Sequence, residues 1–157
     1  MLLGHEKVSF LHLPTPLEYL PGVSKDLGVE FYIKRDDLTN LGVGGNKLRK
    51  LEYLLKDAQD QGCTMLLTLG GAQTNHGRLT AAAVKARYEA QGEKVYEIPI
   101  GGSSDVGMLG YYECAMELTE QAKQMGLEDA TVVSAVGSIG TYMGLYCGLK
   151  NENSPWT

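Results

Sequence analysis

The sequence predicts an α/β fold with a mostly parallel sheet and flanking helices. A unit of strand, glycine turn and helix recurs three times, with the turns at Gly70, Gly101 and Gly137. This recurrence is typical of parallel strands joined by right-handed crossovers, whose ligands collect at the carboxyl ends of the strands. Of the 157 residues, 43% are hydrophobic and 21% are charged, which suits one domain with its own core. We therefore expect residues 1–157 to form a single compact α/β unit.

The first part of the chain predicts one strand between a short helix and a long one. Residues 29–34 alternate as a strand does, and leucines recur at helical spacing after Asn46, which is a suitable N-cap. The expected elements are an extended opening at 13–17, a helical turn at 24–27 that Gly28 ends, a strand at 29–34, a loop at 35–45 and a helix from Asn46 to Gly62.

The rest of the chain alternates strands and helices. Residues 64–69 form a continuous apolar run, typical of a strand that is buried on both faces. Glycines at 92 and 126 are expected to end two of the helices. The expected elements are strands at 64–69, 94–100 and 130–134, with helices at 74–90, 108–125 and 142–149.

Charge and composition disfavour several classes of protein. The net charge is −5, so non-specific attraction to nucleic acid or to an anionic membrane is not expected. We see neither an apolar leader nor an uncharged apolar stretch long enough to span a bilayer, and we expect a cytoplasmic protein. The three cysteines lack CxxC spacing and the histidines do not cluster, so neither a metal site nor a disulfide framework is predicted.

One lysine, Lys47, stands where a glycine turn passes into an apolar helical segment. The first turn of a helix lies at the positive end of the helix dipole. That position suits an amine that must lose its proton, as a Schiff-base lysine does. Arg49 and Lys50 would lower its pKa further through like-charge repulsion. The alternative is a solvated basic patch at the start of a surface helix.

The turn at residues 134–141 follows an apolar strand and opens a helix, so it is a candidate anion site. Small residues let backbone N–H groups converge on an anion, and Ser138 and Thr141 add hydroxyl groups. The turn lacks both the GxxxxGK[ST] and the GxGxxG patterns, which favours a monophosphate ester over a nucleoside triphosphate or a dinucleotide. A plain tight turn is the alternative.

Two further polar groups have ordinary interpretations of their own. Residues 73–76 are Gln-Thr-Asn-His at a strand-to-helix turn, and a helix N-cap with its neighbours would explain them. Asp36 and Asp37 could act as a general acid/base pair, but ion pairs with Lys34 and Arg35, or caps of the loop, are better supported.

Taken together and in this order, these segments resemble the D-cysteine desulfhydrase and aminocyclopropane-carboxylate deaminase family of fold-type II pyridoxal-phosphate enzymes. The resemblance implies a shortened form of the tryptophan-synthase-β-like architecture. In that form residues 1–63 carry the cofactor lysine, residues 64–92 are a remnant of the smaller domain and residues 93–157 are part of the larger domain. The segments that carry the resemblance are 14–20, 32–39, 44–52, 73–76, 101–111 and 137–141.

The resemblance also implies roles for individual residues. Lys47 would form a Schiff base with pyridoxal 5'-phosphate, and Asn75 would hydrogen-bond the hydroxyl group of the cofactor ring. Thr74 stands where the family has a catalytic serine that faces the substrate carboxylate or takes part in proton transfer. The implied cofactor-binding residues are Lys47, Asn46, Asn75, Val136, Gly137, Ser138, Ile139, Gly140 and Thr141, and the implied substrate-binding residues are Thr74, Asn75 and His76.

The implied activity is elimination of thiol and ammonia from D-cysteine, a small amino acid, to give pyruvate. His76 after Asn75 resembles the desulfhydrases and favours this activity over an aminocyclopropane-carboxylate deaminase, since the deaminases tend to have glutamine at that position. A third possibility is a non-catalytic fragment that binds phosphate or cofactor and associates with itself. The family tends to form dimers, and it continues after Arg87 and after Leu149 with segments that have no counterpart in this chain.

Overall fold

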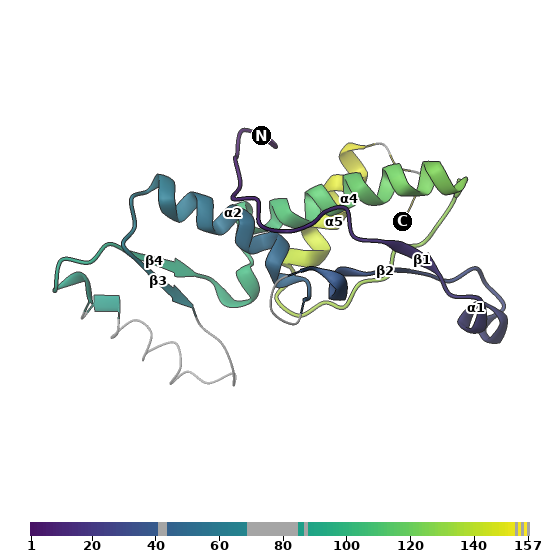
Figure 1. Ribbon diagram of the computed structural model, residues 1–157, viewed down its shortest axis with the longest axis horizontal. Coiled ribbons are helices and arrows are strands. Elements are labelled where there is room, and N and C mark those ends of the chain that lie inside the picture. The colour runs from purple at the N-terminus through teal and green to yellow at the C-terminus, as the bar shows by residue number, and fades with distance from the viewer. Residues whose placement is uncertain (41–43, 69–84, 87, 153, 155, 157) are drawn as a thin grey trace.

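The computed structural model describes residues 1–40, 44–68, 85–86, 88–152, 154 and 156. Figure 1 shows an elongated molecule with three long helices in its middle and a small sheet toward each end. The elements are β1 (Leu17–Tyr19), α1 (Pro21–Leu27), β2 (Tyr32–Lys34), the 3-10 helix η1 (Asp36–Leu38), α2 (Lys47–Asp60), β3 (Met65–Thr68), β4 (Val95–Ile98), the 3-10 helix η2 (Ile100–Gly102), α4 (Asp105–Met125) and α5 (Gly140–Asn151).

The three long helices form the core, with α4 packed against both α2 and α5. Glycines permit this close packing. A Cβ atom added at Gly144 of α5 would lie 2.5 Å from the carbonyl oxygen of Met108 in α4, and one added at Gly110 of α4 would clash with the backbone of Arg49 in α2. Because interiors are packed as densely as crystals, these contacts fix how the helices lie relative to one another.

The two sheets of the described residues have two strands each. β1 and β2 pair antiparallel, with Leu17 opposite Lys34, and β3 and β4 pair parallel, with Met65 opposite Val95. The α/β class and the parallel pairing of the 64–69 and 94–100 segments are therefore as predicted. The strand expected at 130–134 is wrong, because those residues form no strand. Their exposure nevertheless alternates, as in a strand with one face covered.

Most helix ends follow the local signals of the sequence. Gly28 ends α1 with a left-handed φ of 69°, and α2 begins at Lys47. Helix α4 begins three residues earlier than expected because the Ser104 hydroxyl accepts a hydrogen bond from the Gly107 N–H and caps it. Of the helix expected at 74–90, residues 85–86 and 88–89 are helical, and residues 74–84 and 87 lie outside the described part.

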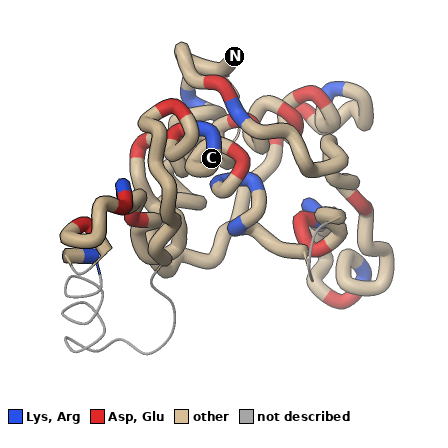
Figure 2. Tube along the Cα trace, turned by 60° about the vertical axis from the view of Figure 1, so that its left-hand side comes forward, with Lys and Arg blue, Asp and Glu red and all other residues tan. Residues whose placement is uncertain are grey.

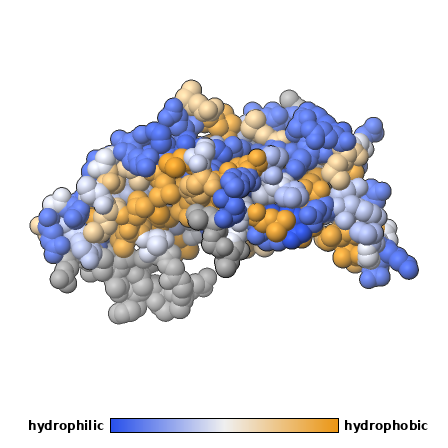
Figure 3. Space-filling model, viewed as in Figure 1, coloured by the Kyte–Doolittle hydropathy of each residue, from blue (hydrophilic) through white to orange (hydrophobic). Residues whose placement is uncertain are grey.

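Charged and apolar side chains are distributed differently over the surface. Figure 2 shows positive and negative residues beside one another along the trace rather than in blocks of one sign. Figure 3 shows apolar side chains gathered over the part of the molecule that carries β3 and β4, where Leu66 and Ile100 are exposed. Among the described helices, none has both the length and the apolar character that crossing a membrane requires.

Candidate functional site

The candidate site is a cavity of about 550 Å³ between the start of α2, the segment at 132–139 and the facing sides of α4 and α5. Lys47 and Asn46 line it from α2, and Gly137, Ser138 and Thr141 line it from the turn that opens α5. The predicted cofactor lysine and the predicted anion turn therefore border one cavity, although they lie far apart in the sequence.

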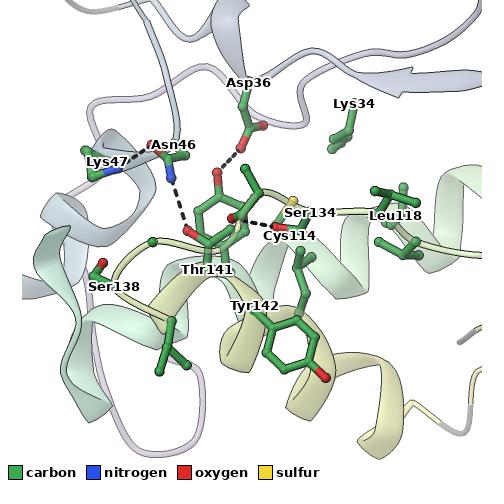
Figure 4. Close-up of a pocket in the computed structure, with 17 residues that line it drawn as sticks. Lys34, Asp36, Asn46, Lys47, Cys114, Leu118, Ser134, Ser138, Thr141 and Tyr142 are labelled. Atoms are coloured by element: carbon green, nitrogen blue, oxygen red, sulfur yellow. Dashed lines mark hydrogen bonds between the residues drawn. The ribbon is translucent and has the colours of Figure 1, made fainter.

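One side chain connects the lysine to the turn. The Lys47 ammonium donates to the Asn46 Oδ1 atom at 2.7 Å, and the Asn46 Nδ2 atom donates to the Thr141 hydroxyl oxygen at 3.1 Å (Figure 4). Asn46 occupies the N-cap position of α2, as predicted, but its side chain does not cap the helix. Its amide group is used entirely within the site instead.

The turn at residues 137–141 has the features of an anion cradle. No side chain caps α5, and although the Gly140 N–H donates to the Ser138 carbonyl oxygen at 2.8 Å, the next amide groups of the first turn keep their capacity to donate. Ile139 holds a positive φ of 66°, a conformation that a β-branched residue rarely adopts outside functional sites. The neighbouring glycine turn supports the cradle, because the hydroxyl oxygens of Ser103 and Ser138 lie 2.7 Å apart. A side chain at Gly140 would press against Ser103, at 2.5 Å.

The cradle residues do not all reach the cavity. Gly137, Ser138, Ile139 and Thr141 line it, whereas Val136 and Gly140 are not among its lining residues. The predicted residues Thr74, Asn75 and His76, with the glycine turn at Gly70, lie outside the described residues. Their roles stay predictions.

Lys50 is a basic residue whose environment the sequence did not reveal. Its side chain is 1% exposed, and its ammonium donates to the Gly101 carbonyl oxygen at 3.1 Å and lies 5.8 Å from the centre of the Tyr111 ring. Burial, and then repulsion from Lys47, lower the pKa of Lys50 to about 8. The expected like-charge repulsion thus lowers the pKa of the buried Lys50, one helical turn after Lys47. The three-residue spacing between the two lysines is the sequence feature that could have indicated this effect.

Arg49 is also buried, so the solvated basic patch is wrong for both residues. The Arg49 guanidinium is 0% exposed and donates to the Asp36 carboxylate at 2.9 and 3.0 Å and to the Glu117 carboxylate at 2.9 Å. Burial alone would raise the pKa of Asp36, but the hydrogen bonds and charge of Arg49 outweigh it and hold that pKa below its usual range. The Tyr111 hydroxyl also donates to Asp36, at 2.6 Å.

The ion pairs expected of the two aspartates divide differently from the prediction. Asp37 pairs with Arg35, as expected. Asp36 pairs with Arg49 instead, while Lys34 pairs with Glu117 of α4. Because Asp36 and Asp37 point to different partners, the structure gives no support to an acid/base pair.

Cys114 is the one cysteine on the wall of this cavity. Burial raises the pKa of its thiol to about 12. The thiol therefore stays protonated at neutral pH and forms part of the apolar wall rather than a nucleophile.

Comparison with known proteins assigns this arrangement to a family. Residues 8–87, which include Lys47, match the family described as "Pyridoxal-phosphate dependent enzyme". The chain belongs to this family. The description of this family names the predicted cofactor, and the chain resembles an enzyme.

The related proteins fall in the group that the sequence resembled. "Putative 1-aminocyclopropane-1-carboxylate deaminase" of Pyrococcus abyssi is 38% identical to this chain and aligns with 100% of it and 62% of its own length. "D-cysteine desulfhydrase" of Salmonella typhimurium is also 38% identical, over 92% of this chain and 60% of its own length. A crystal structure described as an "ACC deaminase homologue" superposes on 99% of this chain and 62% of its own, with 31% identity and a TM-score of 0.88.

These matches confirm the predicted fold-type II architecture. The chain spans about 60% of the length of the relatives, by the 62% and 60% coverages above. The alignment with the Pyrococcus protein extends over 206 positions, more than the 157 residues of this chain, so that relative has residues inside the matched range that this chain lacks. The expected position of these missing residues, after Arg87, stays a prediction.

Proposed function

We propose that this chain is a pyridoxal-phosphate-dependent lyase that eliminates thiol and ammonia from D-cysteine, with Lys47 as the residue that holds the cofactor. One observation supports the proposal most strongly. Lys47 and the uncapped turn at 137–141 border the same cavity and are joined through Asn46. An amine and an anion cradle in one cavity suit a ligand that carries both an aldehyde and a phosphate.

The described residues fit the cofactor. The Lys47 side chain is exposed to solvent at the cavity, so its amine is accessible. The backbone amides at the start of α5, together with the hydroxyls of Ser138 and Thr141, would hold the phosphate. Lys50 lies buried beside the Gly101 turn and would add positive charge behind the cradle.

The chemistry divides between cofactor and protein. When bound, pyridoxal phosphate supplies a ring that withdraws electrons from the α-carbon of an amino acid. Lys47 would hold the cofactor through its amine and, once released by the substrate amine, would take the α-proton. The Asp36, Arg49 and Tyr111 cluster would keep the cavity wall rigid.

The choice of D-cysteine rests on the sequence around the predicted substrate residues. Thr74, Asn75 and His76 would contact the substrate, and His76 favours the desulfhydrase activity. Activity on aminocyclopropane carboxylate is the alternative within the family, since relatives of both names are equally similar at 38% identity. A dimer and a cytoplasmic location complete this proposal.

The decisive experiment asks whether Lys47 binds the cofactor. Purified protein mixed with pyridoxal phosphate should develop an absorption band in the violet region that Lys47→Ala lacks. Lys25→Ala, which removes an exposed lysine of α1, is the matched control and should keep the band. A band of equal strength in Lys47→Ala would contradict the proposal. Sulfide release from D-cysteine, compared with ammonia release from aminocyclopropane carboxylate, then assigns the substrate.

A non-catalytic unit that associates with itself is the second candidate. The segment at 130–139 favours it, because Val133, Val136 and Ile139 are 90%, 60% and 55% exposed and give this segment an apolar surface. Light scattering across a concentration series distinguishes the candidates when it is combined with the spectrum. Association without a Lys47-dependent band would support this second candidate over the enzyme.

A further inference from the structure

Both polar atoms of the Asn46 side-chain amide, the oxygen and the nitrogen, are engaged in hydrogen bonds. Its oxygen accepts from the Lys47 ammonium at 2.7 Å, and its nitrogen donates to the Thr141 oxygen at 3.1 Å. Asn46 and Thr141 are 95 residues apart in the sequence, so the tertiary fold creates this bridge. The Asn46 side chain does not cap α2, and therefore the bridge has no part in starting that helix.

The hydrogen bonds of this bridge run in one direction (Figure 4). Lys47 donates to Asn46, and Asn46 donates to the oxygen of Thr141. The Thr141 hydroxyl keeps its own hydrogen, which is available to an acceptor in the turn. An anion in the turn would therefore be the last acceptor of a chain that starts at the Lys47 amine.

We propose that Asn46 is a positioning residue that couples the Lys47 amine to an anion held by the turn at 137–141. The inference rests on the proposed function, since it takes that turn to be the phosphate cradle. Hydrogen bonds in such a chain polarise one another, so an anion at Thr141 makes the Asn46 oxygen a better acceptor for the ammonium. The bridge thereby holds the amine beside the cradle until the cofactor aldehyde arrives.

The experiment measures the Lys47 amine without any cofactor. Trace acetylation with acetic anhydride, read by peptide mass spectrometry, gives the reactivity of Lys47 relative to Lys25. Inorganic phosphate is compared with potassium chloride at the same ionic strength, so that general screening cancels. Because phosphate strengthens the hydrogen bond that holds the protonated amine, we expect it to slow acetylation of Lys47 by about 1.5- to 2-fold, as a gain of up to about 30% in the strength of one hydrogen bond would.

Four variants identify the bridge as the cause. Asn46→Ala and Thr141→Val should each reduce the phosphate effect to less than about 1.2-fold, while Thr141→Ser, which keeps the hydroxyl, should preserve it. Asn40→Ala is the matched control, because Asn40 also bridges two segments, through Phe10 and His12, but does not line the cavity. It should respond to phosphate as the native chain does.

The outcomes separate this inference from the proposed function. If phosphate leaves Lys47 unaffected, or if Asn46→Ala responds as the native chain does, the coupling is refuted, even where the pyridoxal phosphate band forms. If the phosphate effect depends on Asn46 but no band forms, the coupling stands and the enzyme proposal fails. A loss of the phosphate effect in Asn40→Ala would also overturn the inference, because the effect would then not depend specifically on the Asn46 bridge.

Discussion

Replacing Arg49 with methionine removes the only described cation that contacts Asp36. Arg49 is 0% exposed, and its partners Asp36 and Glu117 have side chains only 14% and 13% exposed. In the variant both carboxylates stay nearly buried, and each has lost its ion pair with Arg49. Loss of one side of a buried ion pair costs about 3–5 kcal/mol, so the free energy of unfolding at pH 7 should fall by that amount.

The pH dependence gives this prediction a second readout. The folded-state pKa of Asp36 is held below its unfolded value, so its contribution is present above the unfolded pKa and is lost as the pH falls through the folded one. Arg49→Met removes that contribution. The gap between the native chain and the variant should therefore narrow once the pH drops below about 4.

Urea denaturation followed by circular dichroism measures both effects. Arg35→Met is the matched control, because it removes the same charge from pairs with Asp37 and Glu18 that lie at the surface, and it should change stability far less. Arg49→Lys should fall between, since an ammonium keeps the charge without the two-pronged geometry. Equal unfolding midpoints for the two methionine variants, or a gap that stays constant with pH, would refute the reasoning.

Two further predictions concern helix packing and Lys50. Gly144→Ala should lower the free energy of unfolding by about 1–3 kcal/mol, because its Cβ would press on the Met108 backbone at 2.5 Å. Gly22→Ala, which meets open space, should not, and equal losses would argue against the packing explanation. The Lys50 amine, followed by NMR of isotope-labelled lysine because it is buried, should titrate with a midpoint near pH 8, and that midpoint should increase in Lys47→Ala, because Lys47 is one cause of the shift. The unfolded value is 10.5, so the unfolded chain binds more protons between pH 8 and 10.5 and stability should rise over that range; a midpoint near 10.5 in the native chain would contradict this.

The parts of the fold that local chemistry controls could be predicted from the sequence. Leucine periodicity located α2 and placed Lys47 at its start, and Gly28 marked the end of α1. The turn before α5 was predicted from its small residues and is part of the cavity wall. Each of these signals lies within one helix or one turn, where neighbouring residues determine the conformation.

The parts that depend on distant partners could not be predicted. The sequence gives no sign that Arg49 would be buried, because its carboxylate partners lie 13 and 68 residues away. The segment at 130–134 has the composition of a strand, yet a strand forms only when another strand pairs with it. None of the four described strands pairs with this segment. In the same way, β1 depends on its pairing with β2 rather than on its own three residues.

The site is therefore a consequence of helix packing rather than of the site residues alone. Lys47 belongs to α2 and Thr141 to α5, and the two helices are held together mainly through α4. The close approaches at Gly110 and Gly144 set the distances between these helices, and so they determine whether Asn46 can reach Thr141. Because the bridge spans only 3.1 Å at this end, a shift of α5 by one ångström would break it. The glycines of α4 and α5 thus help to position Lys47, although they do not contact it.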